Sequence, residues 1–260
     1  GDLEGGIIQD ILVKDGDFVT KGQDLIVLNN TLAQANFNII MQQYLALLSR
    51  KCRLLSERDF LEVIDFEPLH DENTYGFDVT TMIELENRFF RTRKTMLNDQ
   101  LDILSQQRKQ IKKEIDGIQS QLDASVIQKR ILAKQVKDQE LLFNAGVISI
   151  VDYNQIRQQF AEITGQVGAL TSSIAKLEQS LIEINIQKNQ LKSQHLAEIV
   201  AELTKTDQET LDIYQRHTTA KDTLDRVTIK APVAGVVKGL NYYTEGGVIE
   251  PSRPIMDIVP

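Results

Sequence analysis

The longest stretch without proline, residues 69–231, constrains this chain more than any other feature of its sequence. It covers 163 positions, and the five prolines lie outside it, at 68, 232, 251, 254 and 260. Glycine follows the same division, with nine of 14 in residues 1–30 and 227–260. A compact α/β enzyme needs a loop about every ten to twenty residues, and loops use glycine and proline. The middle therefore predicts very long helices, and the two flanks predict a different structure.

Composition excludes several function classes. Lys and Arg number 29 against 37 Asp and Glu, a net charge of −8, which argues against a nucleic-acid surface. Aromatic residues make up 6% and tryptophan is absent, which argues against a large globular core. The single Cys52 forms no intrachain disulfide and fits either redox environment. No apolar run approaches the roughly 20 residues that cross a bilayer, and the start at Gly1 leads us to expect a piece of a longer protein with its membrane anchor elsewhere.

A strict heptad pattern occupies the second half of the proline-free stretch. Alternating steps of four and three reach nine apolar residues in nine positions: Ile156, Phe160, Ile163, Val167, Leu170, Ile174, Leu177, Leu181 and Ile184. A repeat of 3.5 residues keeps one narrow stripe of a helix turned toward a partner helix. This pattern predicts a coiled-coil helix over about 150–225, with its seam along these positions.

The preceding segment, about 79–143, carries a matching register. Ten of 14 positions are apolar in the series Leu97, Leu101, Leu104, Arg108, Ile111, Ile115, Ile118, Leu122, Ser125, Lys129, Leu132, Val136, Gln139 and Phe143. Residues 144–149 separate the two registers. Asn144 and Gly146 favour a left-handed helix cap, and Ser149 can cap the next helix with Asp152 as a variant capping box. Two long helices with so short a link form an antiparallel hairpin.

A further helix is expected over about 31–64, before an acidic linker. At about 1.5 Å per residue, the helices over 31–64 and 79–143 placed end to end would be longer than the helix over 150–225. We therefore expect the first helix to lie beside the other two, in a region of three helices. Residues 62–78 hold six acids and no Lys or Arg. His70, Asp71 and Glu72 could contribute to a cation site there, but the regular ligand spacing of a calcium loop is absent. We interpret the stretch as a solvated linker.

The two flanks share one pattern of short β-strands. Residues 6–28 and 235–259 each show an apolar strand, an acidic residue before glycine, a buried valine and a closing apolar strand. Neither copy can bury its own face. Because a helical hairpin returns the chain to its start, residues 1–30 and 227–260 are expected to form one sandwich from two halves, with residues 31–226 inserted between them.

The flanks resemble half-motifs of biotinyl and lipoyl domains. The first reads Gly-x-x-x-x-Ile-x-Val-x-x-Gly-Asp-x-Val-x-x-Gly-Gln-x-Leu from residue 6, and the second Ile-Lys-Ala-Pro-Val-Ala-Gly-Val-Val from residue 229. The resemblance implies turns at Gly16, Gly22, Pro232, Gly235 and Gly246. Carrier domains hold a modified lysine at a hairpin tip between the halves. Here helices replace that hairpin and Lys230 is expected within a strand, so we expect no cofactor.

A lipoyl-like β-sandwich split by a long helical hairpin and an extra first helix resembles the HlyD-like membrane fusion proteins. The fold class is thus mostly α with a small β-part. The resemblance implies a periplasmic adaptor of a Gram-negative type I secretion system, not an enzyme. It also implies an anchor in the inner membrane beside an ABC transporter, a homohexamer, a TolC-like outer-membrane channel and a secreted protein substrate. No catalytic, phosphate-binding or paired-cysteine motif is visible.

The family's hairpin-tip pattern is Arg-x3-Leu-x6-Ser. Aligned on Ser149, its leucine falls on Leu142, while its arginine position is Asp138. The residues expected to contact a partner are Asp138, Leu142, Asn144, Gly146, Val147 and Ser149.

Other classes of protein remain open from the sequence. A multidrug-efflux adaptor is the runner-up, because the hairpin does not separate drug export from protein export. A biotin or lipoyl carrier and a plain coiled-coil structural protein are the alternatives outside the adaptors. A carrier would hold a prosthetic group on a lysine, and a plain coiled coil would not require the β-halves to pair.

Overall fold

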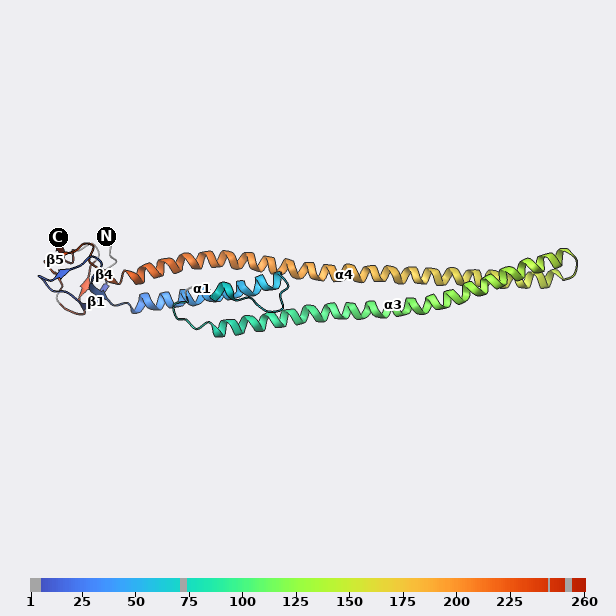
Figure 1. The fold of residues 1–260 in the computed structure, drawn as a ribbon, viewed down its shortest axis with the longest axis horizontal. Coiled ribbons are helices and arrows are strands. Elements are labelled where there is room, and N and C mark those ends of the chain that lie inside the picture. Colours follow the sequence, from blue (N-terminus) through green and yellow to red (C-terminus); the bar gives the residue numbers. More distant parts are fainter. Residues whose placement is uncertain (1–5, 71–73, 243, 251–253) are drawn as a thin grey trace. The chain divides into compact units, whose positions relative to one another are not determined.

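The computed structural model describes residues 6–70, 74–242, 244–250 and 254–260. Within them the helices are α1 (Thr31–Arg58), α2 (Glu67–His70), α3 (Thr80–Asn144) and α4 (Ile150–Asp225). The strands are β1 (Gly6–Ile11), β2 (Phe18–Val19), β3 (Asp24–Leu28), β4 (Thr228–Lys230), β5 (Gly235–Lys238), β6 (Val248–Ile249) and β7 (Asp257–Val259). Figure 1 shows α3 returning through a short turn into α4, which confirms the expected antiparallel hairpin.

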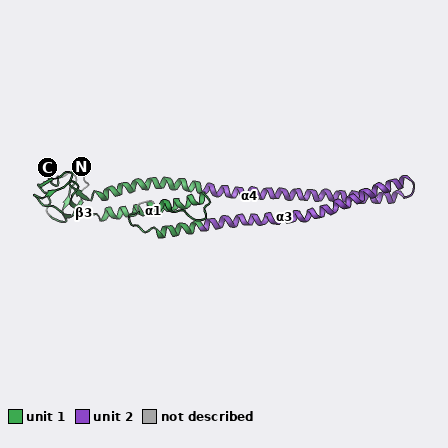
Figure 2. Cartoon of the chain, viewed as in Figure 1, with its two compact units in different colours: residues 1–90, 199–260 green, residues 91–198 purple. Residues whose placement is uncertain are grey.

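The chain divides into two compact units (Figure 2). Unit 1 comprises residues 1–90 and 199–260, and unit 2 comprises residues 91–198. This division differs from the expected boundaries at 30/31 and 226/227. The first turns of α3 and the last turns of α4 pack with α1, so they belong with unit 1 and leave only the rest of the hairpin in unit 2.

The β-domain of unit 1 draws strands from both ends of the chain. The four-stranded sheet has the order β4-β3-β1-β6 and the three-stranded sheet the order β2-β5-β7. Each sheet therefore joins strands from residues 6–28 to strands from residues 228–259, through antiparallel pairs throughout. Side chains of both halves share one core, with Val19, Ile26 and Val237 fully buried. The prediction of one domain from two halves is confirmed.

Three of the expected glycine turns have left-handed backbone. Gly16, Gly22 and Gly246 have φ of 94°, 83° and 83°. Pro232 lies in the bend between β4 and β5. Gly235 was expected in a turn but is the first residue of β5, directly after the bend. A Cβ at that position would stand 2.7 Å from the Val259 carbonyl carbon and would collide with the attached oxygen, so Gly235 permits the close approach of β7.

A second core in unit 1 joins three helices. Phe37, Met41 and Leu45 on α1 are buried in one cluster with Phe90 on α3 and Ile213 on α4. Figure 1 shows α1 lying alongside these ends of α3 and α4. The expected three-helix region is therefore present.

Helix α1 ends at Arg58, six residues before the expected boundary at 64. Phe60 takes a left-handed φ of 53°, and the Leu61 and Phe60 amides donate to the carbonyls of Ser56 and Glu57 at 2.9 and 3.2 Å. This is a Schellman cap. It usually uses glycine, and a phenylalanine there gave no sequence signal for the end of the helix. The chain then turns back and buries Ile64 and Leu69.

The heptad seam holds α3 and α4 together in unit 2. All nine expected seam positions of α4 are buried or half-buried, as are the expected positions of α3 except the exposed Arg108. Leu132, Ile156 and Ile163 form one buried cluster along the seam, with Val136, Tyr153 and Phe160 packed around them. The coiled-coil prediction is confirmed.

Candidate partner-docking site at the hairpin tip

The turn between α3 and α4 is a Schellman motif built around Gly146. The Val147 amide donates to the Leu142 carbonyl at 2.9 Å, and the Gly146 amide donates to the Phe143 carbonyl at 2.9 Å. Gly146 has φ of 72°, the left-handed conformation that this motif requires. Asn144 is the last residue of α3 and is exposed. The terminal carbonyls of α3 are thereby satisfied, which fixes the direction of the turn.

Ser149 caps α4 from the other side of the turn. Its hydroxyl accepts the Asp152 amide at 3.2 Å and donates to an Asp152 carboxylate oxygen at 2.7 Å. The predicted cap by Ser149 is confirmed, whereas the Asp152 carboxylate accepts from the Ser149 hydroxyl and not from the Ser149 amide that a capping box uses. The carboxylate in the first turn of α4 also favours the positive end of the helix dipole. The tip is thus set by local bonds at both helix ends.

Below the turn, aromatic side chains brace the two helices. The rings of Phe143 and Tyr153 stack with centroids 5.3 Å apart and planes 10° apart. The Arg157 guanidinium lies 5.6 Å from the centre of the Tyr153 ring. Such pairs add about 0.5–1.5 kcal/mol beyond the area that they bury. They hold the ends of α3 and α4 at a defined separation.

Large apolar side chains face solvent above this brace. The exposed fractions are 66% for Leu141, 43% for Leu142, 67% for Val147, 50% for Ile150 and 71% for Val151. Exposed apolar groups gathered at one end of an element are typical of a protein contact. Leu142 and Val147 were expected here from the sequence, whereas Leu141, Ile150 and Val151 were not. Their signal was present, because they are apolar at positions outside the heptad seam.

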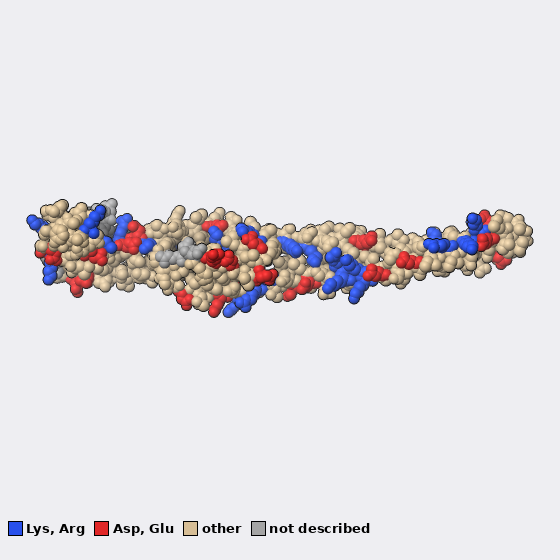
Figure 3. Space-filling view, viewed as in Figure 1, with Lys and Arg blue, Asp and Glu red and all other residues tan. Residues whose placement is uncertain are grey.

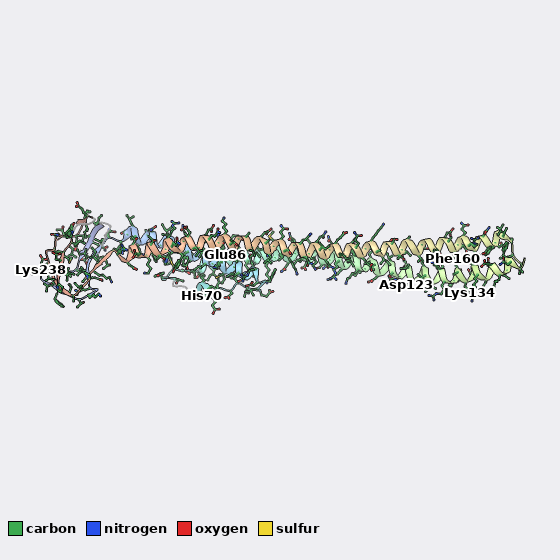
Figure 4. All side chains as sticks on the ribbon, turned by 90° about the horizontal axis from the view of Figure 1, so that it is seen from above. His70, Glu86, Asp123, Lys134, Phe160 and Lys238 are labelled. Carbon is green, nitrogen blue, oxygen red and sulfur yellow. The ribbon has the colours of Figure 1, made fainter. Side chains whose placement is uncertain are left out.

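The residues at the tip are acidic, and a lysine lies one helical turn below them. Residues 138–156 contain Asp138, Glu140 and Asp152 and no Lys or Arg. Asp138 is exposed on α3, four residues before Leu142. Lys134, one turn lower, is exposed on the outer side of α3 near the tip, whereas Phe160 of α4 packs in the seam (Figure 4). The tip therefore presents an apolar surface with an acidic margin.

The described residues of the other two candidates, the carrier lysine Lys230 and the acidic linker, form no prosthetic-group or metal site. Lys230 ends strand β4, where its ammonium lies 3.3 Å from the Asp24 carboxylate. Asp71 and Glu72 of the acidic linker lie outside the described residues. Among the residues that are described, no group of three His, Cys, Asp or Glu is placed to hold a metal ion. No helix in that part of the chain is long and apolar enough to cross a membrane.

Comparison with known proteins identifies the class. The family model described as AprE, long alpha-helical hairpin, matches residues 33–223. The solved soluble domain of LipC, a membrane fusion protein of a type I secretion system, is 30% identical with a TM-score of 0.91, and the alignment covers 98% of this chain and 96% of that one. The periplasmic adaptor EmrA, at 16% identity and a TM-score of 0.62 over 98% of this chain and 69% of its own, shares the fold. The fold is that of a membrane fusion protein.

Relatives along the whole chain narrow the class. The type I secretion membrane fusion protein PrsE of Rhizobium meliloti is 31% identical over 99% of this chain and 59% of its own length. The alkaline protease secretion protein AprE of Pseudomonas aeruginosa is 25% identical over 98% and 59%. This chain thus spans about three fifths of the length of these relatives. It belongs to the AprE family of long α-helical hairpins, among the HlyD-like membrane fusion proteins.

Proposed function

We propose that this chain is part of a periplasmic adaptor for type I protein secretion. The observation that carries the proposal is the match to the LipC soluble domain over nearly the whole of both chains. The adaptor links an inner-membrane ABC transporter to a TolC-like outer-membrane channel, and a secreted protein passes between them. Its anchor in the inner membrane is expected in a segment other than residues 1–260. The chain acts through geometry and surfaces rather than through catalysis.

The hairpin tip supplies the contact with the channel. Leu142 and Val147 belong to the exposed apolar surface, and the caps at Gly146 and Ser149 hold that surface in one conformation. Preorganisation of this kind reduces the entropy lost on binding. We propose that these side chains pack on helix ends of the channel in the manner of coiled-coil knobs. Asp138 then selects a channel end that offers a cation or a hydrogen-bond donor.

Self-assembly completes the proposal. A single hairpin encloses nothing, whereas six copies side by side form a closed conduit. Each copy contributes its β-domain to the base and its hairpin to the wall. The different surfaces of α3 and α4 suit a head-to-tail contact, which closes into a ring rather than a two-fold dimer.

The alternatives have less support. In a carrier domain a hairpin tip joins the two halves, but here β3 leads into α1 and β4 follows α4. A plain coiled coil does not account for two sheets that each combine both ends of the chain. EmrA at 16% identity shows the fold alone and does not favour drug efflux.

The test is secretion by cells whose only adaptor is the full-length protein with a tip substitution. Leu142→Asp and Val147→Asp place a charge in the apolar contact, and we expect secreted protein in the medium to fall at least about tenfold. Ile127→Asp is the matched control, because Ile127 is also exposed on α3 (57%) but lies away from the tip. Normal secretion from both tip variants, with adaptor levels unchanged, would reject the tip contact.

A further inference from the structure

Glutamine lines one side of the heptad seam in unit 2. In a heptad labelled a to g the seam is formed by a and d, and positions e and g lie on opposite sides of it. In α3 the g positions are every seventh residue from Gln100 to Gln135, and each is glutamine except Glu114. In α4 they are every seventh residue from Gln159 to Gln194, and each is glutamine or serine. These 12 positions, here called the g strip, therefore carry a single charge.

The g positions of the two helices lie side by side. Because α3 and α4 are antiparallel, the g positions of one helix adjoin those of the other. Gln100 of α3 and Gln194 of α4 accordingly line one cleft of about 330 Å³ between the helices. The hydroxyls of Ser173 and Ser180 donate to carbonyls of their own helix at 3.0 and 3.2 Å. The polar groups that the strip offers to solvent are therefore mainly the neutral amides of its exposed glutamines.

The opposite side of the seam carries charge. The e positions, every seventh residue over 98–133 of α3 and over 157–192 of α4, form an e strip of 12 residues, of which four are charged and one is glutamine. Beside this strip, every seventh residue of α3 from Asp102 to Lys137 is charged. Figure 3 shows one face of the molecule, on which Lys and Arg side chains gather over the middle of the hairpin. Charge is thus distributed unevenly around the hairpin.

Uncharged surface continues from the g strip onto α3. The neighbouring row of α3, every seventh residue from Ile103 to Ile131, contains no charged residue. Its two isoleucines stand at the ends of the row, roughly 40 Å apart along the helix, so they form no continuous apolar patch. On α4 the strip is bordered by Glu162, Lys176 and Glu183. One broad side of the hairpin is therefore poor in charge and centred on the g strip.

Helix formation does not explain this choice of residues. Glutamine, glutamate and lysine have similar helix propensities, so all three would serve equally well on an exposed helix. Glutamate and lysine at positions e and g usually form salt bridges between the helices of a coiled coil, and the g strip forgoes them. A neutral amide exchanges hydrogen bonds with water for hydrogen bonds with a peptide at little net gain. A surface of such amides contacts an extended polypeptide of any charge without holding it.

We propose that the g strip faces the secreted polypeptide in transit and that the e strip faces the surrounding periplasm. The inference rests on the proposed function and specifies which broad side of each hairpin lines the conduit. A closed wall of two-helix layers turns one broad side inward. Passage through a pore requires contacts weak enough to release, and fixed charges in a confined space would hold segments of opposite sign. Charge on the outer side keeps the assembly soluble.

Photo-cross-linking in cells tests the orientation. A photoreactive amino acid replaces Gln121 or Gln128 of the full-length adaptor, and Gln119 is the matched control. Gln119 and Gln121 are exposed glutamines of α3 only two residues apart, but they belong to the e strip and the g strip. The probe is the protein whose secretion requires the adaptor, fused to a stably folded domain that halts it in transit. We expect cross-links to this fusion from Gln121 and Gln128 and none from Gln119.

Added charge tests the reason for the glutamines. Gln121→Arg with Gln128→Arg places two fixed charges per copy on the g strip, and secretion of the unfused protein should fall at least about fivefold. Gln121→Asn with Gln128→Asn keeps the strip neutral and should secrete as the wild type does. Gln119→Arg with Ala133→Arg adds the same charge to exposed positions of the e strip and should also secrete normally. Circular dichroism of the purified variants checks that the helices are intact.

Several outcomes overturn the assignment of the g strip. One is a cross-link to the halted fusion from Gln119 as strong as that from Gln121, and another is no cross-link from either g-strip position. Equal loss of secretion from the two arginine pairs is the third, because it would make added charge harmful on both sides. Each of these leaves the proposed function standing, since secretion by the Leu142→Asp variant decides that question separately.

Discussion

The Arg53 guanidinium donates through Nε to the Glu86 carboxylate at 2.6 Å, in the interior of the three-helix region of unit 1. Its other nitrogens donate to Glu57 at 3.1 Å and to Glu202 at 2.9 Å. Arg53 and Glu57 belong to α1, Glu86 (labelled in Figure 4) to α3 and Glu202 to α4. One buried side chain thus links all three helices. Burial lowers the pKa of Arg53, but the hydrogen bond to Glu86 and the surrounding acids outweigh it and raise the pKa.

Removal of Arg53 should therefore destabilise unit 1 strongly. Arg53→Ala leaves carboxylates buried without their cation, and the expected loss is about 3–5 kcal/mol in the free energy of unfolding, measured with urea. Because folding raises the pKa of Arg53, its contribution to stability is fully present at every pH below the unfolded pKa of arginine, which includes neutral pH, and is lost only as the pH rises through the folded pKa. Arg50→Ala is the control: its exposed pair with Glu209 at 3.8 Å should contribute at most about 1 kcal/mol. Similar losses from both variants would contradict this role for Arg53.

The start of α3 should respond to acid. Hydrogen bonds from the Thr80 side chain and amide lower the pKa of Asp78 below its ordinary value of 3.8. A depressed pKa contributes stability above the unfolded value, and that contribution disappears as the pH falls through the folded value. Asp78→Asn should lower the melting temperature at pH 7 but not at a pH well below 3.8. Asp99→Asn, exposed in the interior of α3, is the control. A difference that persists in acid would show that the charge of Asp78 is not involved.

The two kinds of hairpin glycine should respond in opposite directions. Gly146→Ala forces an L-residue into φ of 72° and should destabilise by about 1–2 kcal/mol. Gly165→Ala lies within α4 and should stabilise by about 0.5–1 kcal/mol. No atom lies within 4 Å of the added Cβ at either position, so backbone conformation alone separates them. Thermal unfolding of both variants followed by circular dichroism measures the difference, and equal shifts would contradict it.

Gly235 should tolerate alanine worse than the turn glycines of the β-domain do. The added Cβ would stand 2.7 Å from the Val259 carbonyl carbon and must displace β7 from β5. Overpacking of this kind costs about 1–3 kcal/mol, occasionally more. Hydrogen exchange of the β5 amides should accelerate in Gly235→Ala. In Gly16→Ala, where no atom lies within 4 Å, the strain stays at the turn and the β5 amides should remain protected.

The backbone of the hairpin tip could be predicted from the local sequence, but its exposed apolar surface only in part. Gly146, Ser149 and Asp152 act through bonds between residues at most a few positions apart, so the sequence was enough to predict the tip. The apolar surface around it was predicted only in part: Leu142 was predicted from the family's tip pattern and Val147 from its place in the turn, whereas Leu141, Ile150 and Val151 belong to neither that pattern nor the seam. Whether an apolar residue beyond the seam faces solvent depends on how the turn directs the two helices.

By itself, the sequence determined the helical hairpin, its seam, its tip and the split β-domain. Each was predicted from the heptad repeat, from the positions of glycine and proline or from the two half-motifs of the flanks. These patterns can be recognised without knowing which distant residues come into contact. Only the tertiary structure decided that Phe60 ends α1, that Gly235 serves a close contact and that Arg53 is buried. Arg53 meets Glu86 and Glu202 across 33 and 149 residues, and Gly235 meets Val259 of β7, in a strand that lies beyond β6 in the sequence. The burial of the Arg53 charge and the need for glycine at 235 both depend on these neighbours, so neither could be predicted from the residues next to them in the sequence.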